Sequence, residues 1–218
     1  MCSITASKDL DKLRELIELN SYRGTHSHSI SAFSVGGIYD TIYLTNDLLY
    51  QRKGFGPLDL DEHIEELSLC HDAYFVAHQQ APTTESKDQK SIHPAEHNDY
   101  MLWHNGIIKE KTILKLQEEL ETDCSWDTML LIKYIEKYGS PNNIDGTFSC
   151  MMYDGISLSI FRNEISPMFI DGQLNISSTK FENSGRLAPN IMYQLHLDTD
   201  EIEVYNDFET VENPYYFG

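Results

Sequence analysis

Short strand-like runs fill the second half of the chain, and they restrict its fold more than any other feature. From Gly146 onward, apolar and β-branched residues occur in brief runs separated by Gly, Asp, Asn and Pro. These runs are TFSCMMYD, SLSIFRN, PMFIDGQ, LNISS, MYQLHL and EIEVYND. Short strands bounded by turn residues are typical of antiparallel sheets. We therefore expect this half of the chain to be rich in strands.

The first half mixes strands with helices. Residues 2–6 are apolar enough for a strand, and residues 8–20 carry Leu and Ile near helical spacing. The runs SHSISAFSV and IYDTIYL, joined by Gly36–Gly37, predict a hairpin of two strands. Residues 59–71 predict a second amphipathic helix, and AYFVAH, which follows, predicts a buried strand.

The middle of the chain adds another hairpin and two more helices. YMLWHNGII predicts a strand, a turn and a second strand, because Asn105–Gly106 is a strong hairpin signal. KEKTILKLQEEL and DTMLLIKYIEKYG predict helices, the second of which ends at Gly139. Many antiparallel strands with a few helices indicate an α+β fold, in which sheets pack on each other and helices cover the outside.

Length and spacing favour one compact unit. At 218 residues the chain suits a single domain, residues 1–218. Residues 79–99 are polar and contain Pro, so they are expected to form one long loop and not a linker between domains. Loops of that length inside a compact domain are usually functional.

The chain is strongly acidic, with 16 Lys and Arg against 35 Asp and Glu and a formal charge of −19. This charge repels phosphate backbones and anionic lipids, so nucleic acid and membrane surfaces are excluded as expected partners. The N-terminus lacks the pattern of a signal sequence, and no run approaches the roughly 18 apolar residues of a membrane span. We therefore expect a cytoplasmic protein.

Cys2 directly follows Met1. The four cysteines, at positions 2, 70, 124 and 150, lack CxxC spacing and disulfide-like density, so reduced thiols are expected. If Met1 is removed, the α-amine of Cys2, with a reference pKa of about 8, lies beside its own thiol and can accept its proton. One residue then supplies both nucleophile and base. The alternative, that Cys is the second residue by chance, stays open on this feature alone.

Further motifs follow Cys2 in order along the chain. They are Cys2-Ser3-Ile4, Tyr22-Arg23-Gly24, His78 to Thr83, His93-Pro94, His104 to Ile108, Asp127-Thr128, Arg162 to Pro167 and Ser177-Ser178. With this combination the chain resembles the class II glutamine amidotransferases, whose N-terminal cysteine attacks the side-chain amide of glutamine. The resemblance covers nearly the whole chain. It implies a stand-alone N-terminal-nucleophile domain with four layers, αββα, in which helices cover two antiparallel sheets.

The resemblance also implies a role for individual residues. Cys2 is the nucleophile, and Asn105 and the Gly106 N–H stabilise the oxyanion that forms when the amide is attacked. Asp127 binds the α-ammonium group of glutamine, and His104 joins the substrate-binding set. No cofactor and no metal are implied. Without the resemblance, Asn105–Gly106 is a hairpin turn and Asp127 a helix start, and these interpretations remain open.

Recognition of the α-carboxylate is where the chain departs from the family. Gln80 stands where the family has an Arg, and a neutral amide brings no charge, which costs roughly 1–3 kcal/mol of recognition. Ala81 replaces an aromatic residue, whereas Thr83 of the substrate-binding set is retained. Arg23 is the candidate that compensates for Gln80, with a structural salt bridge as the alternative.

Three histidines raise the question of a zinc site, because imidazole is a common metal ligand. His78, His93 and His104 each fall within a motif that binds no metal in the family. We therefore expect His93 and His104 to organise the loop around the site.

The sequence thus predicts a glutamine amidotransferase that releases ammonia through a glutamyl thioester on Cys2. An ammonia-accepting synthetase or transferase partner is expected, because the chain ends soon after its last strands. Two alternatives remain. One is a catalytically degenerate domain of the same fold that binds or regulates, suggested by Gln80 and Ala81. The other is an amide hydrolase whose substrate is not glutamine.

Overall fold

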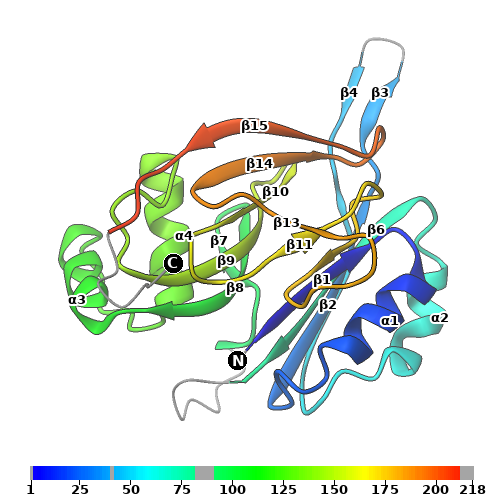
Figure 1. Ribbon diagram of the computed structural model, residues 1–218, viewed down its shortest axis with the longest axis horizontal. Helices are drawn as coiled ribbons and strands as arrows, with labels where there is room; N and C mark the ends of the chain where they lie inside the picture. Colours follow the sequence, from blue (N-terminus) through cyan, green and yellow to red (C-terminus); the bar gives the residue numbers. More distant parts are fainter. Residues whose placement is uncertain (1, 40–41, 82–90, 212–218) are drawn as a thin grey trace.

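Two antiparallel β-sheets lie face to face, with helices on the outer side of each (Figure 1). The computed structural model describes residues 2–39, 42–81 and 91–211. The predicted α+β fold class is confirmed, and the order of layers is helix, sheet, sheet, helix. None of the described helices is long and apolar enough to cross a membrane.

The first sheet has seven strands in the order β13-β11-β12-β1-β6-β2-β5. Its strands are β1 (Ser3–Ser7), β2 (Ser27–Ser34), β5 (Leu48–Phe55), β6 (Ala73–Gln80), β11 (Phe169–Ile170), β12 (Ile176–Ser177) and β13 (Gly185–Arg186). The second sheet has six strands in the order β15-β14-β10-β9-β8-β7. Its strands are β7 (Ala95–His97), β8 (Tyr100–Ile108), β9 (Gly146–Tyr153), β10 (Leu158–Arg162), β14 (Ile191–His196) and β15 (Glu201–Asp207).

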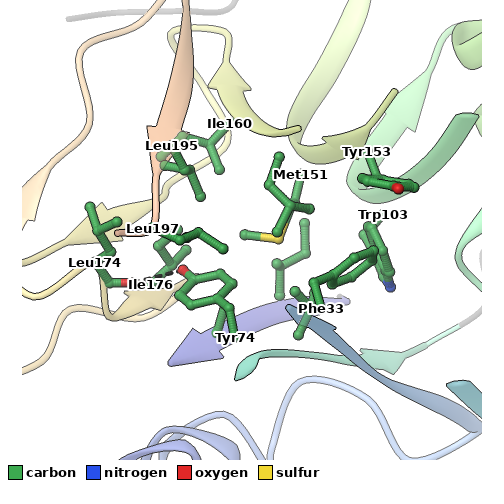
Figure 2. Close-up of a cluster of buried hydrophobic side chains, with 14 of the residues drawn as sticks. Phe33, Tyr74, Trp103, Met151, Tyr153, Ile160, Leu174, Ile176, Leu195 and Leu197 are labelled. Carbon is green, nitrogen blue, oxygen red and sulfur yellow. Dashed lines mark hydrogen bonds between the residues drawn. The ribbon is translucent and has the colours of Figure 1, made fainter. Parts of the chain in front are cut away.

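An apolar core fills much of the space between the sheets (Figure 2). Successive side chains of a strand point to opposite faces, so alternate residues of each strand enter this core. Ile4 comes from β1, Tyr74 from β6, and Trp103 from β8. Each fully buried large side chain contributes about 1.5–3 kcal/mol of burial free energy.

Helices cover the outer faces. On the first sheet lie α1 (Leu10–Leu19), the 3-10 turn η1 (Leu60–His63) and α2 (Ile64–Ser68), and on the second lie α3 (Glu110–Glu119) and α4 (Asp127–Tyr138). The side chain of Asp9 caps α1 by accepting a hydrogen bond from the Lys12 N–H. Gly139 ends α4 with a φ of 79°, a left-handed conformation that glycine adopts without steric cost.

The structure corrects four local predictions. Residues 79–99 do not form one uninterrupted loop, because β6 extends to Gln80 and Ala95–His97 form β7. Asn105–Gly106 is not a turn, because both residues lie inside β8 and pair with Ser149 and Phe148 of β9. The predicted hairpin between SHSISAFSV and IYDTIYL is also wrong. Strand β2 is buried on both faces and pairs with β5 and β6 instead, while β3 (Gly37–Tyr39) and β4 (Ile42–Leu44) form a separate hairpin. The predicted helix over 59–71 is shorter, divided into η1 and α2.

Candidate active site

A cavity of about 480 Å³ lies where β1 begins and β6 ends. Its lining includes Cys2 before β1, Gln80 at the end of β6, Gly106 near the end of β8, and Asp127 at the start of α4. The sequence separates these residues by many positions, and the fold brings all four to one cavity. The volume falls within the range of about 300–1,000 Å³ that is usual for small-molecule sites.

Cys2 faces this cavity and is 8% exposed. Its thiol lies 3.5 Å from the carbonyl oxygen of Ala81, and its own carbonyl accepts a hydrogen bond of 3.0 Å from Arg23 Nε. Burial raises the pKa of the Cys2 thiol. The buried sulfur therefore needs a nearby base if it is to act as a thiolate at neutral pH.

Gly106 of β8 lines the cavity, whereas its neighbour Asn105 is buried and is not among the lining residues. Asn105 Nδ2 donates to Ser178 Oγ at 3.2 Å, and the same hydroxyl accepts from the Ile4 N–H at 3.0 Å. Ser178 thereby fixes the Asn105 amide to β1, two residues beyond Cys2. An amide NH₂ has two hydrogens, of which this hydrogen bond uses one.

Gly106 is required by the close approach of β9. A Cβ at this position would lie 1.8 Å from the carbonyl oxygen of Thr147 and 2.7 Å from His104 Nε2. A second close approach occurs at Gly24, where a Cβ would lie 2.6 Å from the Gln80 carbonyl carbon. The loop that carries Arg23 can therefore lie directly against the end of β6.

Gln80 lines the cavity, but its side chain is already bonded to the protein. Its Oε1 accepts from Ser27 Oγ at 3.0 Å, and its Nε2 donates to the Ser91 carbonyl at 3.2 Å. Thr83, the neighbouring member of the predicted substrate-binding set, lies outside the described residues.

Arg23 lies behind Cys2 and does not line the cavity. It is buried, its Nε donates to the Cys2 carbonyl, and its Nη1 lies 3.4 Å from the Tyr22 hydroxyl. Its guanidinium group also lies 5.8 Å from the centre of the Tyr22 ring. These contacts position the residue that bears the thiol.

Asp127 is the first residue of α4, as the helix-start interpretation expected. Its Oδ1 accepts from the Thr128 N–H at 2.8 Å, and its Oδ2 accepts from the Ile108 N–H at 3.3 Å. Two backbone donors thus hold the carboxylate in one orientation at the wall of the cavity. Its side chain remains 19% exposed, so the group is accessible to a cationic ligand.

Thr128 connects two buried histidines beneath Asp127. Its Oγ1 lies 3.0 Å from His93 Nε2 and 3.1 Å from His104 Nδ1. His104 Nε2 lies 3.3 Å from the Thr147 carbonyl, which can only accept, so Nε2 carries a hydrogen. The Thr128 hydroxyl also lies 3.3 Å from Asp127 Oδ1, to which it can donate its single hydrogen. The hydroxyl therefore links the Asp127 carboxylate with both imidazole rings.

His78 and His93 stack with ring centres 4.2 Å apart. Burial lowers the pKa of His78 to about 3 and holds the pKa of His93 well below its usual value. Both rings are therefore neutral at physiological pH and act as structural groups. Among the described residues, no three His, Cys, Asp or Glu side chains are arranged to hold a metal ion.

Several lining residues were not identified from the sequence. Glu110 begins α3 and adds a second carboxylate to the wall, while Ile113 and Trp126 add apolar surface. Glu110 and Ile113 lay inside a predicted helix, and only the packing of α3 against β8 and α4 brings them to the cavity. Trp126 directly precedes Asp127, and its ring meets His93 edge-on at 5.4 Å between centres.

No protein-family model matches the sequence, and no curated protein matches it either. Among solved structures, the glutamine phosphoribosylpyrophosphate amidotransferase of B. subtilis, complexed with ADP and GMP, is similar with a TM-score of 0.66 at 15% identity. The match covers 94% of this chain and 49% of that one.

A structure described as the allosteric regulatory enzyme of purine biosynthesis gives a TM-score of 0.65, again at 15% identity, over 94% of this chain and 48% of the other. This chain therefore spans about half the length of these two structures. At such low identity the similarity concerns the fold. The chain has the fold of class II glutamine amidotransferase domains, as the resemblance of its motifs implied.

Proposed function

We propose that the chain hydrolyses or transfers a glutamine-type side-chain amide, with Cys2 as the nucleophile. The observation that supports this most strongly is that Cys2, Gly106 and Asp127 border one cavity, with Asn105 joined to β1 through Ser178. A nucleophile, oxyanion donors and an anion for an ammonium group are the parts that this reaction requires.

The reaction begins once Met1 has been removed and the α-amine of Cys2 is free. The amine takes the thiol proton, which matters because burial raises the pKa of that thiol. The thiolate sulfur bonds to the amide carbon, and the carbonyl electron pair moves to oxygen. Asn105 Nδ2 and the Gly106 N–H donate to this oxyanion.

Collapse of the tetrahedral intermediate breaks the C–N bond. The ammonium of Cys2 returns its proton to the departing nitrogen, which leaves as ammonia. A thioester remains on Cys2. Water, deprotonated by the same amine, attacks the thioester and regenerates the thiol.

Ammonia released at the cavity would be lost to solvent unless another site consumed it. The two structures with the same fold have chains about twice as long as this one. One of them is named an amidotransferase. We infer that a synthetase or transferase, as a further domain or a partner protein, takes up the ammonia here.

A second candidate function is ligand binding without catalysis. It is favoured by Gln80, which replaces a cation and is bonded to Ser27 and Ser91. A binding domain has no need of an exposed N-terminal thiol, so the state of Met1 separates the two functions.

The test combines intact mass measurement with ammonia release from glutamine and glutamine-containing dipeptides. We expect protein without Met1 to release ammonia, and Cys2→Ala to lower the rate by about 10³-fold or more. The matched control is Cys70→Ala, which removes a partly exposed thiol beyond α2 and should retain the rate. Processed protein that acts on no amide would support the binding function instead.

A further inference from the structure

The charge of the cavity wall restricts which glutamine derivative can enter. Two carboxylates, Glu110 and Asp127, belong to the lining, and the described lining contains no Lys or Arg. Free glutamine carries an α-ammonium and an α-carboxylate. The first has a partner in Asp127, whereas the second would enter a site whose described charged side chains are both acidic.

Two described cations close to the lining are engaged elsewhere. Lys109, which precedes Glu110, pairs with Asp145 at 2.7 Å. Arg23 donates to the Cys2 carbonyl from behind the nucleophile and does not line the cavity. Neither Lys109 nor Arg23 therefore places its positive charge in the cavity, where the α-carboxylate of glutamine would lie.

Gln80 offers a neutral donor in place of a cation. Its Nε2 gives one hydrogen to the Ser91 carbonyl, and the NH₂ group carries a second. A neutral N–H is well matched to a carbonyl oxygen, whereas a carboxylate gains most from a charged, bidentate partner. A glutamine whose α-carboxyl group is already an amide presents such a carbonyl.

The remaining wall suits a substrate that extends beyond one amino acid. Ile113 and Trp126 line the cavity, and Ile107, also in the lining, is 52% exposed. An apolar residue exposed at the edge of a site gains free energy when a ligand covers it. The residue that follows glutamine in a peptide would reach this surface.

We propose that the preferred substrate is a glutaminyl residue at the amino terminus of a peptide, or another α-amide of glutamine. The inference rests on the proposed function of Cys2. Asp127 binds the free α-ammonium, and Gln80 donates to the carbonyl of the following amide bond. Cys2 forms the thioester with the side-chain carbon and expels ammonia, and water releases the glutamyl product, so that one amide and one water give one carboxylate and one ammonium.

The test compares ammonia release from L-glutamine, L-glutaminylglycine and glycyl-L-glutamine by the full chain without Met1. We expect kcat/KM for glutaminylglycine to exceed that for glutamine by at least about tenfold. Glycylglutamine should be the poorest of the three, because its α-nitrogen is an uncharged amide and its carboxylate is free. Mass spectrometry of the dipeptide identifies the side-chain amide as the bond that breaks.

Gln80→Arg supplies the missing charge, so it should shift the preference toward free glutamine. The matched control is Gln173→Arg, which adds the same charge at an exposed turn and should keep the preference of the parent protein. A parent protein that prefers free glutamine would overturn this inference and leave the proposed function intact. Absence of ammonia from every substrate would overturn both.

Discussion

The space between the two sheets has an apolar region and a polar region, and the same strands supply both. In the apolar region, β6 contributes Tyr74 (Figure 2). It also contributes Val76. The same face of β6 continues toward the cavity with His78 and Gln80. The chain changes in the same way at the start of β1, from Ile4 in the core to Cys2, which precedes the strand, at the cavity. Each of these segments therefore contributes one part to the stabilising core and another part to the candidate site.

The polar region carries a cost that the apolar region offsets. The hydroxyls of Ser29, Ser31 and Ser149 are buried and have no hydrogen-bond partner among the described residues. A buried polar group without a partner costs about 1–3 kcal/mol. Apolar side chains of similar size would avoid that cost. We conclude that the polar region is not optimised for stability, which is typical of regions that serve function.

Phe33→Ala should have the largest effect and should act on stability alone. Phe33 is fully buried, and its ring lies 6.0 Å from that of Trp103 and 4.9 Å from that of Tyr153. Loss of the ring leaves a cavity in the apolar region, so the free energy of unfolding should fall by about 3–5 kcal/mol. Urea denaturation measures the change. Leu69→Ala, at a side chain 75% exposed, should change it by about 0.5 kcal/mol or less.

If folded Phe33→Ala also lost its ammonia release, the apolar region would contribute to catalysis as well as to stability. We expect the rate per folded molecule to stay near that of the parent. The fraction of folded protein, taken from the denaturation curve, corrects the rate.

Asn105→Ala should show the opposite pattern, a loss of catalysis with a smaller loss of stability. Removing one oxyanion donor typically lowers kcat by about 10²–10³-fold, with KM little changed. The matched control is Ser149→Ala, because Ser149 lies directly opposite Asn105 in the β8–β9 pairing and its hydroxyl has no partner in the described part of the chain. A kcat for Asn105→Ala equal to that of the control would remove Asn105 from the proposed mechanism.

The sequence identified most of the elements but not how they assemble. The sequence predicted both the start of α4 at Asp127 and its end at Gly139, because helix caps are local signals. Asn105–Gly106 was misassigned as a turn for the same reason. The local preference of Asn-Gly is overridden by pairing with Phe148 and Ser149, more than 40 positions away in the sequence.

The members of the candidate site were predicted through motifs, whereas their connections were not. Asn105 bonds to Ser178, which is 73 positions away in the sequence, and Thr128 contacts His104 and His93, which are 24 and 35 positions away. Such contacts depend on how the sheets and α4 pack, so they cannot be predicted from the spacing of residues in the sequence. The position of Arg23 was not predictable either. The sequence suggested Arg23 as the cation that compensates for Gln80, whereas the structure places it behind Cys2 and not in the cavity lining.

Thr128→Val should weaken substrate binding more than it slows the chemical step. The substitution keeps the shape of the side chain but removes the hydroxyl that bridges His93 and His104 beside Asp127. The ring nitrogens that face Thr128 lose their partner, at a cost of about 1–3 kcal/mol, and Asp127 loses the hydroxyl donor while it keeps its two backbone donors. We expect a higher KM for the best amide with kcat less affected, and recovery with Thr128→Ser. Equal losses for the Val and Ser variants would assign Thr128 to packing alone.

The smallest effect concerns the pH dependence of stability and tests whether the polar region depends on neutral histidines. The folded pKa of His78 is about 3, below the usual value of 6.5, because of burial. Between these values the unfolded chain binds more protons than the folded one, so the free energy of unfolding falls as the pH drops below about 6.5. One such group contributes a slope of about 1.4 kcal/mol per pH unit.

His78→Gln removes that proton site while retaining a side-chain N–H that can donate to the His104 carbonyl. The slope of the free energy of unfolding between pH 6 and 4 should therefore decrease by about 1.4 kcal/mol per pH unit, whatever the stability at neutral pH. His71→Gln, at an exposed position hydrated in both states, should keep the parent slope. If the slope of His78→Gln also equals that of the parent, His78 is not held neutral by burial. The polar region would then be hydrated and continuous with the cavity, and the contrast with the apolar region would lie in access to water as much as in residue type.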